Sequence, residues 1–410
     1  MRSFRLQGEG KPEINITSAP ASSGVSMGVS WSMGVGFPVD YGAARARFLT
    51  AANALGAEVM PQLHPQPGPK DVELAVDLAW LGPRDAARVL MVSSGMHGFE
   101  GPPGSAVQSL WLEGRVGKTL PADTAVLMVH ALNPWGFAWV SRLTENNVDL
   151  NRNFIDWREP PPGNPYYHRV KDDVRVADMS LQTLMHLAAR NQALAAELGP
   201  AAAQVAVDYG QYEDPEGITF GGKGPEFGHR VMSDVVAPLL AHAREIGVID
   251  WHTGVGAYGE IAILPIDGPA SANAQRIVAW WGQALVENWV RSSLEDMVAK
   301  DPNLANLPLL KTGQMKQALA RWLPKARITG AIIEFGTEQE GSWPDLIYVT
   351  IYDRWLRFVD QTDRMDVAHE RFRSLAAKCF VPDDVDWGRT VVRDGPRLID
   401  EALAGLVAQV

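Results

Sequence analysis

Short aliphatic runs that alternate with long helical stretches are the feature that most constrains the fold of this 410-residue chain. Parallel strands need crossover connections and are buried on both faces, so this alternation is typical of a largely parallel sheet covered by helices. The runs predict strands at residues 87–93, 124–131, 247–251, 260–264 and 329–334. The sequence therefore predicts an α/β fold.

Helical periodicity marks much of the chain between these strands. The sequence DYGAARARFLTAANALG, residues 40–56, predicts an amphipathic helix that ends at Gly56. Further helices are predicted at residues 105–115, 178–197, 229–246, 271–298 and 344–375.

Composition divides the chain into an extension and one large domain. Residues 1–36 are rich in Gly, Ser and Met and show no strand or helix period, so we expect a flexible N-terminal extension. Residues 37–410 are predicted to form the domain. Within it, the segment at about 156–228 is rich in Pro, Gly and Tyr around one helix, and it reads as an insertion between sheet elements.

Charge and cysteine content exclude several classes of function. The net charge of −11 disfavours nucleic acid and anionic membranes as partners, because both repel an acidic protein, and it favours a small molecule or peptide. With one cysteine, any metal must be bound by His and carboxylate groups. No long apolar run or signal-peptide pattern is visible, so we expect a cytoplasmic protein; a homo-oligomer remains open.

Four polar motifs stand at or just beyond the ends of predicted strands. They are SGMHGFEG (94–101), HALNPWG (130–136), DWHTG (250–254) and IIEFG (332–336). In open α/β sheets the ligand site lies at the carboxyl ends of the strands. We therefore expect all four motifs to meet at one edge of the sheet.

His97, Glu100 and His252 are candidate ligands of a zinc ion. Catalytic zinc takes three protein ligands from His and carboxylate side chains and keeps a fourth position for water. His97 and Glu100 share a glycine-rich turn, and His252 ends another strand. By themselves, these residues also fit a chance His-x-x-Glu pair and a hydrogen-bonded histidine at a strand end.

The order of the motifs resembles a known family. The sequence has H-x-x-E, N-P-x-G, D-x-N-R-N-F, D-x-H-T and a strand that ends in Glu, in that order. This order is similar to that of the M14 zinc carboxypeptidases, and D-L-N-R with I-E-x-G is similar to the aspartoacylase and succinylglutamate desuccinylase branch. The stretches FPVDYGAARARF, SSGMHGFEG and GQY…GITFGGK resemble the DUF2817 group, over about residues 37–400.

This resemblance implies a three-layer α/β/α fold with a mixed, mostly parallel sheet, and a zinc carboxypeptidase-like catalytic domain. It implies that His97, Glu100 and His252 hold one zinc ion. Glu334 matches the general base that takes a proton from water and passes it to the leaving nitrogen. Without the resemblance, Glu334 also reads as a strand-end acid satisfied by backbone N–H groups.

The resemblance assigns roles to four further residues near these motifs. Arg142 matches the arginine that stabilises the oxyanion, and Asn151 and Arg152 match the pair that binds a substrate carboxylate. Asp149 matches the carboxylate that accepts the free N–H of His97. As an alternative, Asp149 caps a turn.

The sequence departs from the carboxypeptidase pattern in one respect. Carboxypeptidases usually carry a mobile tyrosine before the catalytic glutamate, whereas here no tyrosine lies between Tyr258 and Glu334. The same interval holds a basic run, which either receives an acidic substrate group or forms a solvated face. Its members are Lys311, Lys316, Arg321, Lys325 and Arg327.

Other catalytic signals are weak. GRVGKT, residues 114–119, lacks the first glycine and the strand context of a phosphate loop, no G-x-S-x-G motif is present, and Cys379 has no motif around it. His130 and His229 lie near predicted site loops and otherwise read as structural.

The sequence thus predicts a zinc-dependent amide hydrolase that acts on a small peptide, as a carboxypeptidase, or on an N-acyl amino acid, as a deacylase. The alternative is a non-catalytic protein that binds a metal or a peptide.

Overall fold

The computed structural model describes residues 36–265, 267, 271–283, 285–286, 313–338, 343–362 and 365–408. The extension predicted at residues 1–36 lies outside this range except for Gly36, and so does part of the helix predicted at 271–298.

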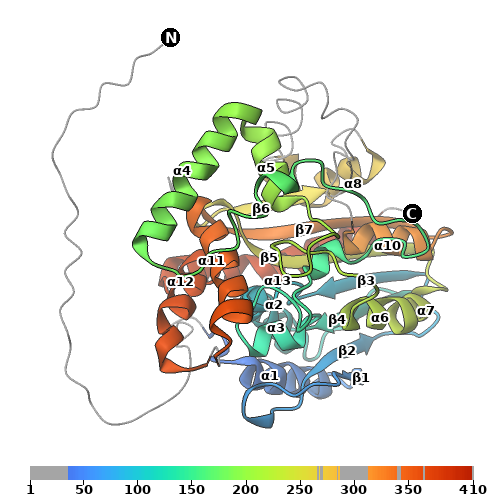
Figure 1. The fold of residues 1–410 in the computed structure, drawn as a ribbon. Coiled ribbons are helices and arrows are strands. Elements are labelled where there is room, and N and C mark those ends of the chain that lie inside the picture. The colour runs from blue at the N-terminus through green and yellow to red at the C-terminus, as the bar shows by residue number, and fades with distance from the viewer. Residues whose placement is uncertain are drawn as a thin grey trace, which may run out of the picture.

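A seven-stranded sheet forms the centre of the described chain (Figure 1). Its order is β1-β2-β4-β3-β5-β7-β6. The inner strands β4, β3, β5 and β7 are parallel, and the other three pair antiparallel at the edges. The strands are β1 (Glu58–Leu63), β2 (Ala75–Leu81), β3 (Arg88–Ser93), β4 (Thr124–His130), β5 (Glu245–Ala257), β6 (Ile261–Pro265) and β7 (Arg327–Glu338).

Helices cover both faces of this sheet (Figure 1). The longer ones are α1 (Tyr41–Ala54), α2 (Gly101–Glu113), α4 (Leu181–Leu198), α5 (Pro200–Asp208), α8 (Ala272–Trp281), α10 (Met315–Trp322), α11 (Trp343–Trp355), α12 (Glu370–Phe380) and α13 (Val385–Ala408). The shorter ones are α3 (Pro134–Ala138), α6 (Phe227–Arg230), η5 (Val231–Val236), α7 (Ala237–Leu240) and η7 (Leu356–Asp360), with single 3-10 turns at Pro69–Asp71, Gly98–Glu100, Leu150–Arg152, Tyr167–Arg169 and Val367–His369.

Alternate side chains of the inner strands enter two separate hydrophobic clusters. On β3, Leu90 and Val92 join the cluster that contains α1, α2, α8 and α13, whereas Val89 and Met91 join the one beneath η5, α7 and α10. A strand with a period of two sends successive side chains to opposite faces, so each inner strand is buried on both sides. The predicted three-layer α/β/α fold with a mixed, mostly parallel sheet is confirmed.

The five predicted strands are all present, and β5 and β7 are longer than expected. Two predictions of continuous helices are wrong. The segment at 229–246 is not one helix, because the helical part ends near Leu240 and strand β5 begins at Glu245. The segment at 344–375 is interrupted between η7 and α12, where Gln361 adopts a left-handed backbone with φ 55°. The insertion predicted at 156–228 stays a prediction; it contains α4 and α5 and contributes no strand to the sheet. Among the described helices, none combines the length and the apolarity that crossing a membrane requires.

Candidate metal centre

The turn after β3 carries His97 and Glu100 to the carboxyl edge of the sheet. Gly98 packs against the backbone of α3, and a Cβ there would lie 2.0 Å from the carbonyl carbon of Gly136. Only glycine fits so close an approach. The Gly98 and Phe99 N–H groups donate to the carbonyl oxygens of Arg142 and Ser141, so the turn is fastened to the loop after α3.

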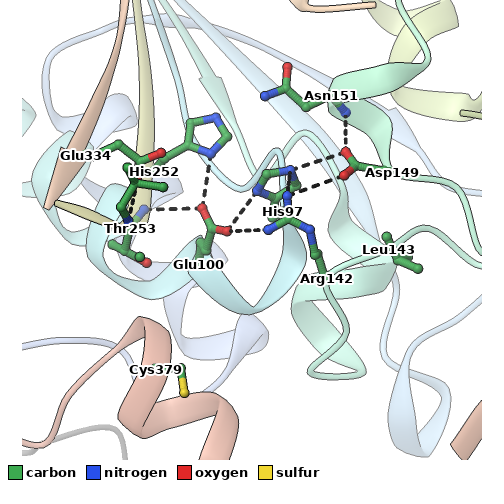
Figure 2. A network of polar contacts seen from close by, with 12 residues as sticks. His97, Glu100, Arg142, Leu143, Asp149, Asn151, His252, Thr253, Glu334 and Cys379 are labelled. Atoms are coloured by element: carbon green, nitrogen blue, oxygen red, sulfur yellow. Dashed lines mark hydrogen bonds and ion pairs between the residues drawn. The ribbon is translucent and has the colours of Figure 1, made fainter. Parts of the chain in front are cut away.

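His97, Glu100 and His252 meet at this edge, and all three are buried (Figure 2). Each offers one ligand atom, and these atoms lie within 4.8 Å of one another. The Nδ1 atom of His97 is 2.8 Å from Glu100 Oε1, and the Nδ1 atom of His252 is 3.1 Å from Glu100 Oε2. Two imidazoles and one carboxylate form the donor set of a catalytic zinc site, so these residues fit such an ion.

The outer nitrogen of each imidazole faces a buried carboxylate. Asp149 Oδ1 lies 3.3 Å from His97 Nε2, and Asp250 Oδ2 lies 3.0 Å from His252 Nε2. Carboxylates in these positions favour the tautomer that carries its proton on Nε2, which leaves the Nδ1 lone pair for a metal. Asp149 thus contacts the outer nitrogen of His97, and its role in orienting that imidazole stays a prediction.

Asp250 is a site residue that the sequence interpretation did not single out. It accepts a hydrogen bond of 2.7 Å from the Ser93 hydroxyl, which fixes the carboxylate on β3. The signal was present in the D-x-H spacing, because residues two apart on a strand lie on the same face of the sheet. A carboxylate two positions before a candidate ligand on a strand thus predicts a partner for the imidazole.

Neighbouring charges outweigh burial in setting pKa values at and around the three candidate ligands. Burial raises the pKa of the Glu100 carboxyl, but His97 and His252 outweigh it and hold that pKa well below its ordinary value. Burial lowers the pKa of His252, and the Asp250 and Glu100 carboxylates more than reverse this. Burial also raises the pKa of Asp149, and the positive charges of Arg142, Arg152 and His97 bring it well below its usual range. The Glu100 and Asp149 carboxyl groups therefore stay ionised, and buried negative charge of this kind favours a bound cation.

Arg142 borders the group of candidate ligands (Figure 2). Its guanidinium donates to Glu100 Oε1 at 3.2 Å and to Asp149 Oδ2 at 3.3 Å, and its Nη2 lies 2.9 Å from His97 Nε2. Asp353 of α11 anchors this segment, because it accepts hydrogen bonds from the Arg142 N–H and the Ser141 hydroxyl. A fixed positive charge thus borders the group of candidate ligands.

Glu334 lies on β7 directly opposite His252 of β5 in the parallel ladder. Residues in register on adjacent strands point to the same face, so the carboxylate stands beside the imidazole, as Figure 2 shows. Glu334 is 6% exposed, and its Oε2 accepts a hydrogen bond of 3.4 Å from the Val255 N–H. The fourth motif therefore reaches the same edge as the other three.

Asn151 and Arg152 lie on the 3-10 turn that follows Asp149. The Asn151 side-chain oxygen is buried and has no hydrogen-bond partner. The Arg152 guanidinium does not contact the candidate metal ligands in any described interaction; it donates to the backbone oxygens of Asp208 and Asn151.

Three described members of the basic run make contacts within the protein. Lys316 pairs with Asp267, Arg321 donates to the Phe154 carbonyl oxygen, and Arg327 pairs with Glu245 at 2.7 Å. Lys311 lies outside the described residues. These pairings favour a structural role over a substrate-binding one for these three residues.

The two histidines that we singled out for their position have structural contacts. His130 lies 2.9 Å from the Ser105 hydroxyl and stacks on Phe48. His229 lies 3.0 Å from the Asn153 carbonyl oxygen and stacks on Phe154. Both rings are buried in contacts that leave them outside the group of candidate ligands.

Asp250→Asn tests the role of the carboxylate behind His252. We expect the metal affinity to fall by about 10- to 100-fold, because an amide no longer fixes the Nε2–H tautomer or raises the basicity of the imidazole. Competition with a chromogenic chelator measures the affinity. Asp214→Asn is the matched control, since Asp214 is similarly buried and accepts a hydrogen bond from the Tyr167 hydroxyl rather than from an imidazole. An unchanged affinity in Asp250→Asn would exclude this role.

Comparisons with known proteins identify one family and several similar structures. A family model described as "Protein of unknown function (DUF2817)" matches residues 37–394. Among curated proteins, none matches the chain. Similar solved structures include carboxypeptidase A from Helicoverpa armigera, with 14% identity over 83% of this chain and 73% of that one and a TM-score of 0.40. Another is succinylglutamate desuccinylase from Chromobacterium violaceum, with 15% identity over 77% and 75% and a TM-score of 0.34.

Proposed function

Since the chain belongs to the DUF2817 family, we propose that it is a zinc-dependent hydrolase that cleaves an amide bond. The observation that carries this proposal is the meeting of His97, Glu100 and His252 with ligand atoms within 4.8 Å of one another. Two imidazoles and a carboxylate suit zinc and leave one coordination position open for water. The named enzymes among the similar structures, a carboxypeptidase and a desuccinylase, agree with this class.

The residues around the site have the roles that such a hydrolysis needs. A zinc ion held there would supply a Lewis acid and lower the pKa of a bound water to about 7. Glu334, beside His252, takes a proton from the attacking water and passes it to the leaving nitrogen. Arg142 stabilises the negative oxygen that forms on the substrate carbonyl. Asp149 and Asp250 orient the two imidazoles through their Nε2 atoms.

Two substrate classes fit this chemistry, namely a small peptide that loses a terminal amino acid and an N-acyl amino acid that is deacylated. A non-catalytic binding protein is the alternative from another class. Glu334 argues against it, because a binding protein has no use for a buried general base next to a metal ligand.

Metal analysis followed by a substrate screen tests the proposal. We expect one zinc per chain, and we expect mass spectrometry to detect products from a mixed library of peptides and N-acyl amino acids. Chelator treatment should abolish the products, and added zinc should restore them. A protein that holds one zinc but is inert on the whole library would favour the binding role, and a protein without affinity for zinc would refute the hydrolase.

A further inference from the structure

Asp353, on helix α11, is a buried carboxylate that contacts the loop on which Arg142 lies. Its Oδ2 atom accepts a hydrogen bond of 2.7 Å from the Ser141 hydroxyl and one of 3.2 Å from the Arg142 N–H. The Ser141 hydroxyl in turn accepts a hydrogen bond of 3.2 Å from the Leu143 N–H. Hydrogen bonds to a charged acceptor are stronger than those between neutral groups, so one buried side chain fixes three consecutive residues of this loop.

The peptide groups on both sides of Arg142 have fixed partners. The N–H donates to Asp353, and the carbonyl oxygen accepts hydrogen bonds from the Gly98 N–H at 3.2 Å and from the Asn133 side-chain amide at 3.5 Å. The Arg142 side chain therefore starts from a backbone position that is set from two directions. Of these contacts, the one with Asp353 comes from a helix that supplies none of the candidate metal ligands.

The same loop is held in a strained conformation. Val140, which directly precedes Ser141, has a positive φ of 51°. A β-branched residue rarely adopts this left-handed region, and such strain persists only where the surrounding contacts hold it. The Ser141 N–H donates to the Gly136 carbonyl oxygen at 2.8 Å, and Asp353 holds the Ser141 hydroxyl. Removal of the carboxylate should therefore let residues 140–142 relax away from their present position.

Arg357, on η7, holds this loop at a second point. Its Nη1 donates to the Glu145 carbonyl oxygen at 2.7 Å, and its Nη2 lies 3.4 Å from the Ser141 hydroxyl oxygen. The Glu145 contact does not involve Asp353. Loss of Asp353 should thus release the Arg142 peptide without detaching the whole loop.

We propose that Asp353 is a positioning residue that acts through Arg142. The Arg142 guanidinium contacts Glu100 Oε1 at 3.2 Å and lies 2.9 Å from His97 Nε2, so its place beside the candidate ligands depends on where its backbone is held (Figure 2). A charge that stabilises a developing negative oxygen acts only from the correct position. This inference rests on the proposed function, in which Arg142 has that task, and adds to it a residue on α11.

The test measures the binding of a small tetrahedral anion, so it needs neither turnover nor a known substrate. Methylphosphonate carries negative oxygens on a tetrahedral centre, as the intermediate of amide hydrolysis does. Isothermal titration gives its dissociation constant for four full-length, zinc-loaded proteins, namely the wild type, Asp353→Ala, Arg142→Gln and the double variant. We expect Arg142→Gln to weaken binding by about tenfold or more, and Asp353→Ala by about three- to tenfold.

The double variant distinguishes a positioning role from a merely structural one. If Asp353 acts through the guanidinium, then Asp353→Ala should change the dissociation constant by less than about twofold once Arg142 is glutamine. Two independent effects would instead multiply. Each of the four proteins should hold one zinc per chain.

Two further variants support the comparison. Ser141→Ala removes one of the two donors to Asp353 and leaves the other, so it should weaken methylphosphonate binding by about two- to threefold, again only when Arg142 is present. It serves the same test if Asp353→Ala does not fold. Asp214→Ala is the matched control, because it removes a similarly buried carboxylate that accepts from the Tyr167 hydroxyl at 2.9 Å. It should unfold at a lower temperature and keep the wild-type affinity for methylphosphonate.

The outcomes separate this inference from the proposed function. Unchanged binding in Asp353→Ala, multiplied effects in the double variant, loss of zinc from Asp353→Ala, or no binding by the wild type would overturn the role of Asp353. Hydrolysis of library compounds by the wild type would still support the hydrolase in each of these cases. Conversely, the expected pattern in a wild-type protein that cleaves nothing in the library would keep the positioning role and refute the hydrolase.

Discussion

Glu334→Gln is expected to retain zinc and to lower kcat by about 10²-fold or more, as the loss of a general base does. Glutamine has nearly the same shape as glutamate and can still contact the Val255 N–H through its amide oxygen, but it cannot take a proton from water. Metal content by atomic absorption and steady-state kinetics on the best substrate of the library measure the two effects.

The control for this variant is Glu338→Gln, which makes the same chemical change at the end of the same strand. It should keep kcat within a few fold of the wild type. If Glu334→Gln turned over normally, Glu334 would be misassigned. If instead it lost zinc, the residue would act on the metal centre rather than on the proton.

His252→Ala is expected to lose both zinc and activity. The substitution removes one of three ligands and leaves the buried carboxylates of Asp250 and Glu100 without the imidazole that lies between them. Two remaining ligands hold zinc poorly, because catalytic sites use three. We expect less than about a tenth of a zinc ion per chain after dialysis, and turnover below detection.

His229→Ala provides the comparison. His229 is a buried histidine whose ring stacks on Phe154, so its removal should lower the stability of the fold. It should unfold at a lower temperature and still bind one zinc. Circular dichroism distinguishes loss of the ligand from loss of the fold. One tightly bound zinc in His252→Ala would place the metal elsewhere in the protein.

The sequence predicted the inner part of the fold better than its periphery. Strands β3, β4, β5 and β7 are continuous aliphatic runs because both of their faces are buried, and such runs are easy to recognise. Strand β1 was missed, since it lies at the edge, is partly exposed and contains Pro61, which weakens any strand pattern. Helix α13 was also missed, and Pro396 interrupts its helical signal.

The sequence could predict those residues of the candidate site that lie at or just beyond the ends of strands. His97, Glu100, His252 and Glu334 lie together because the carboxyl ends of parallel strands share one edge. The contacts of Arg152 were not predictable, because its partner Asp208 is 56 residues away and belongs to a segment without strand register. A motif indicates which residue types are present, whereas the neighbours of a long side chain depend on packing.

The pairing of β5 with β7 has a mechanical consequence. Because His252 and Glu334 are register partners on hydrogen-bonded strands, which lie about 4.8 Å apart, the ladder sets the spacing of their backbones. The position of the Glu334 carboxylate relative to a metal held by His252 would thus be fixed by the sheet rather than by a loop.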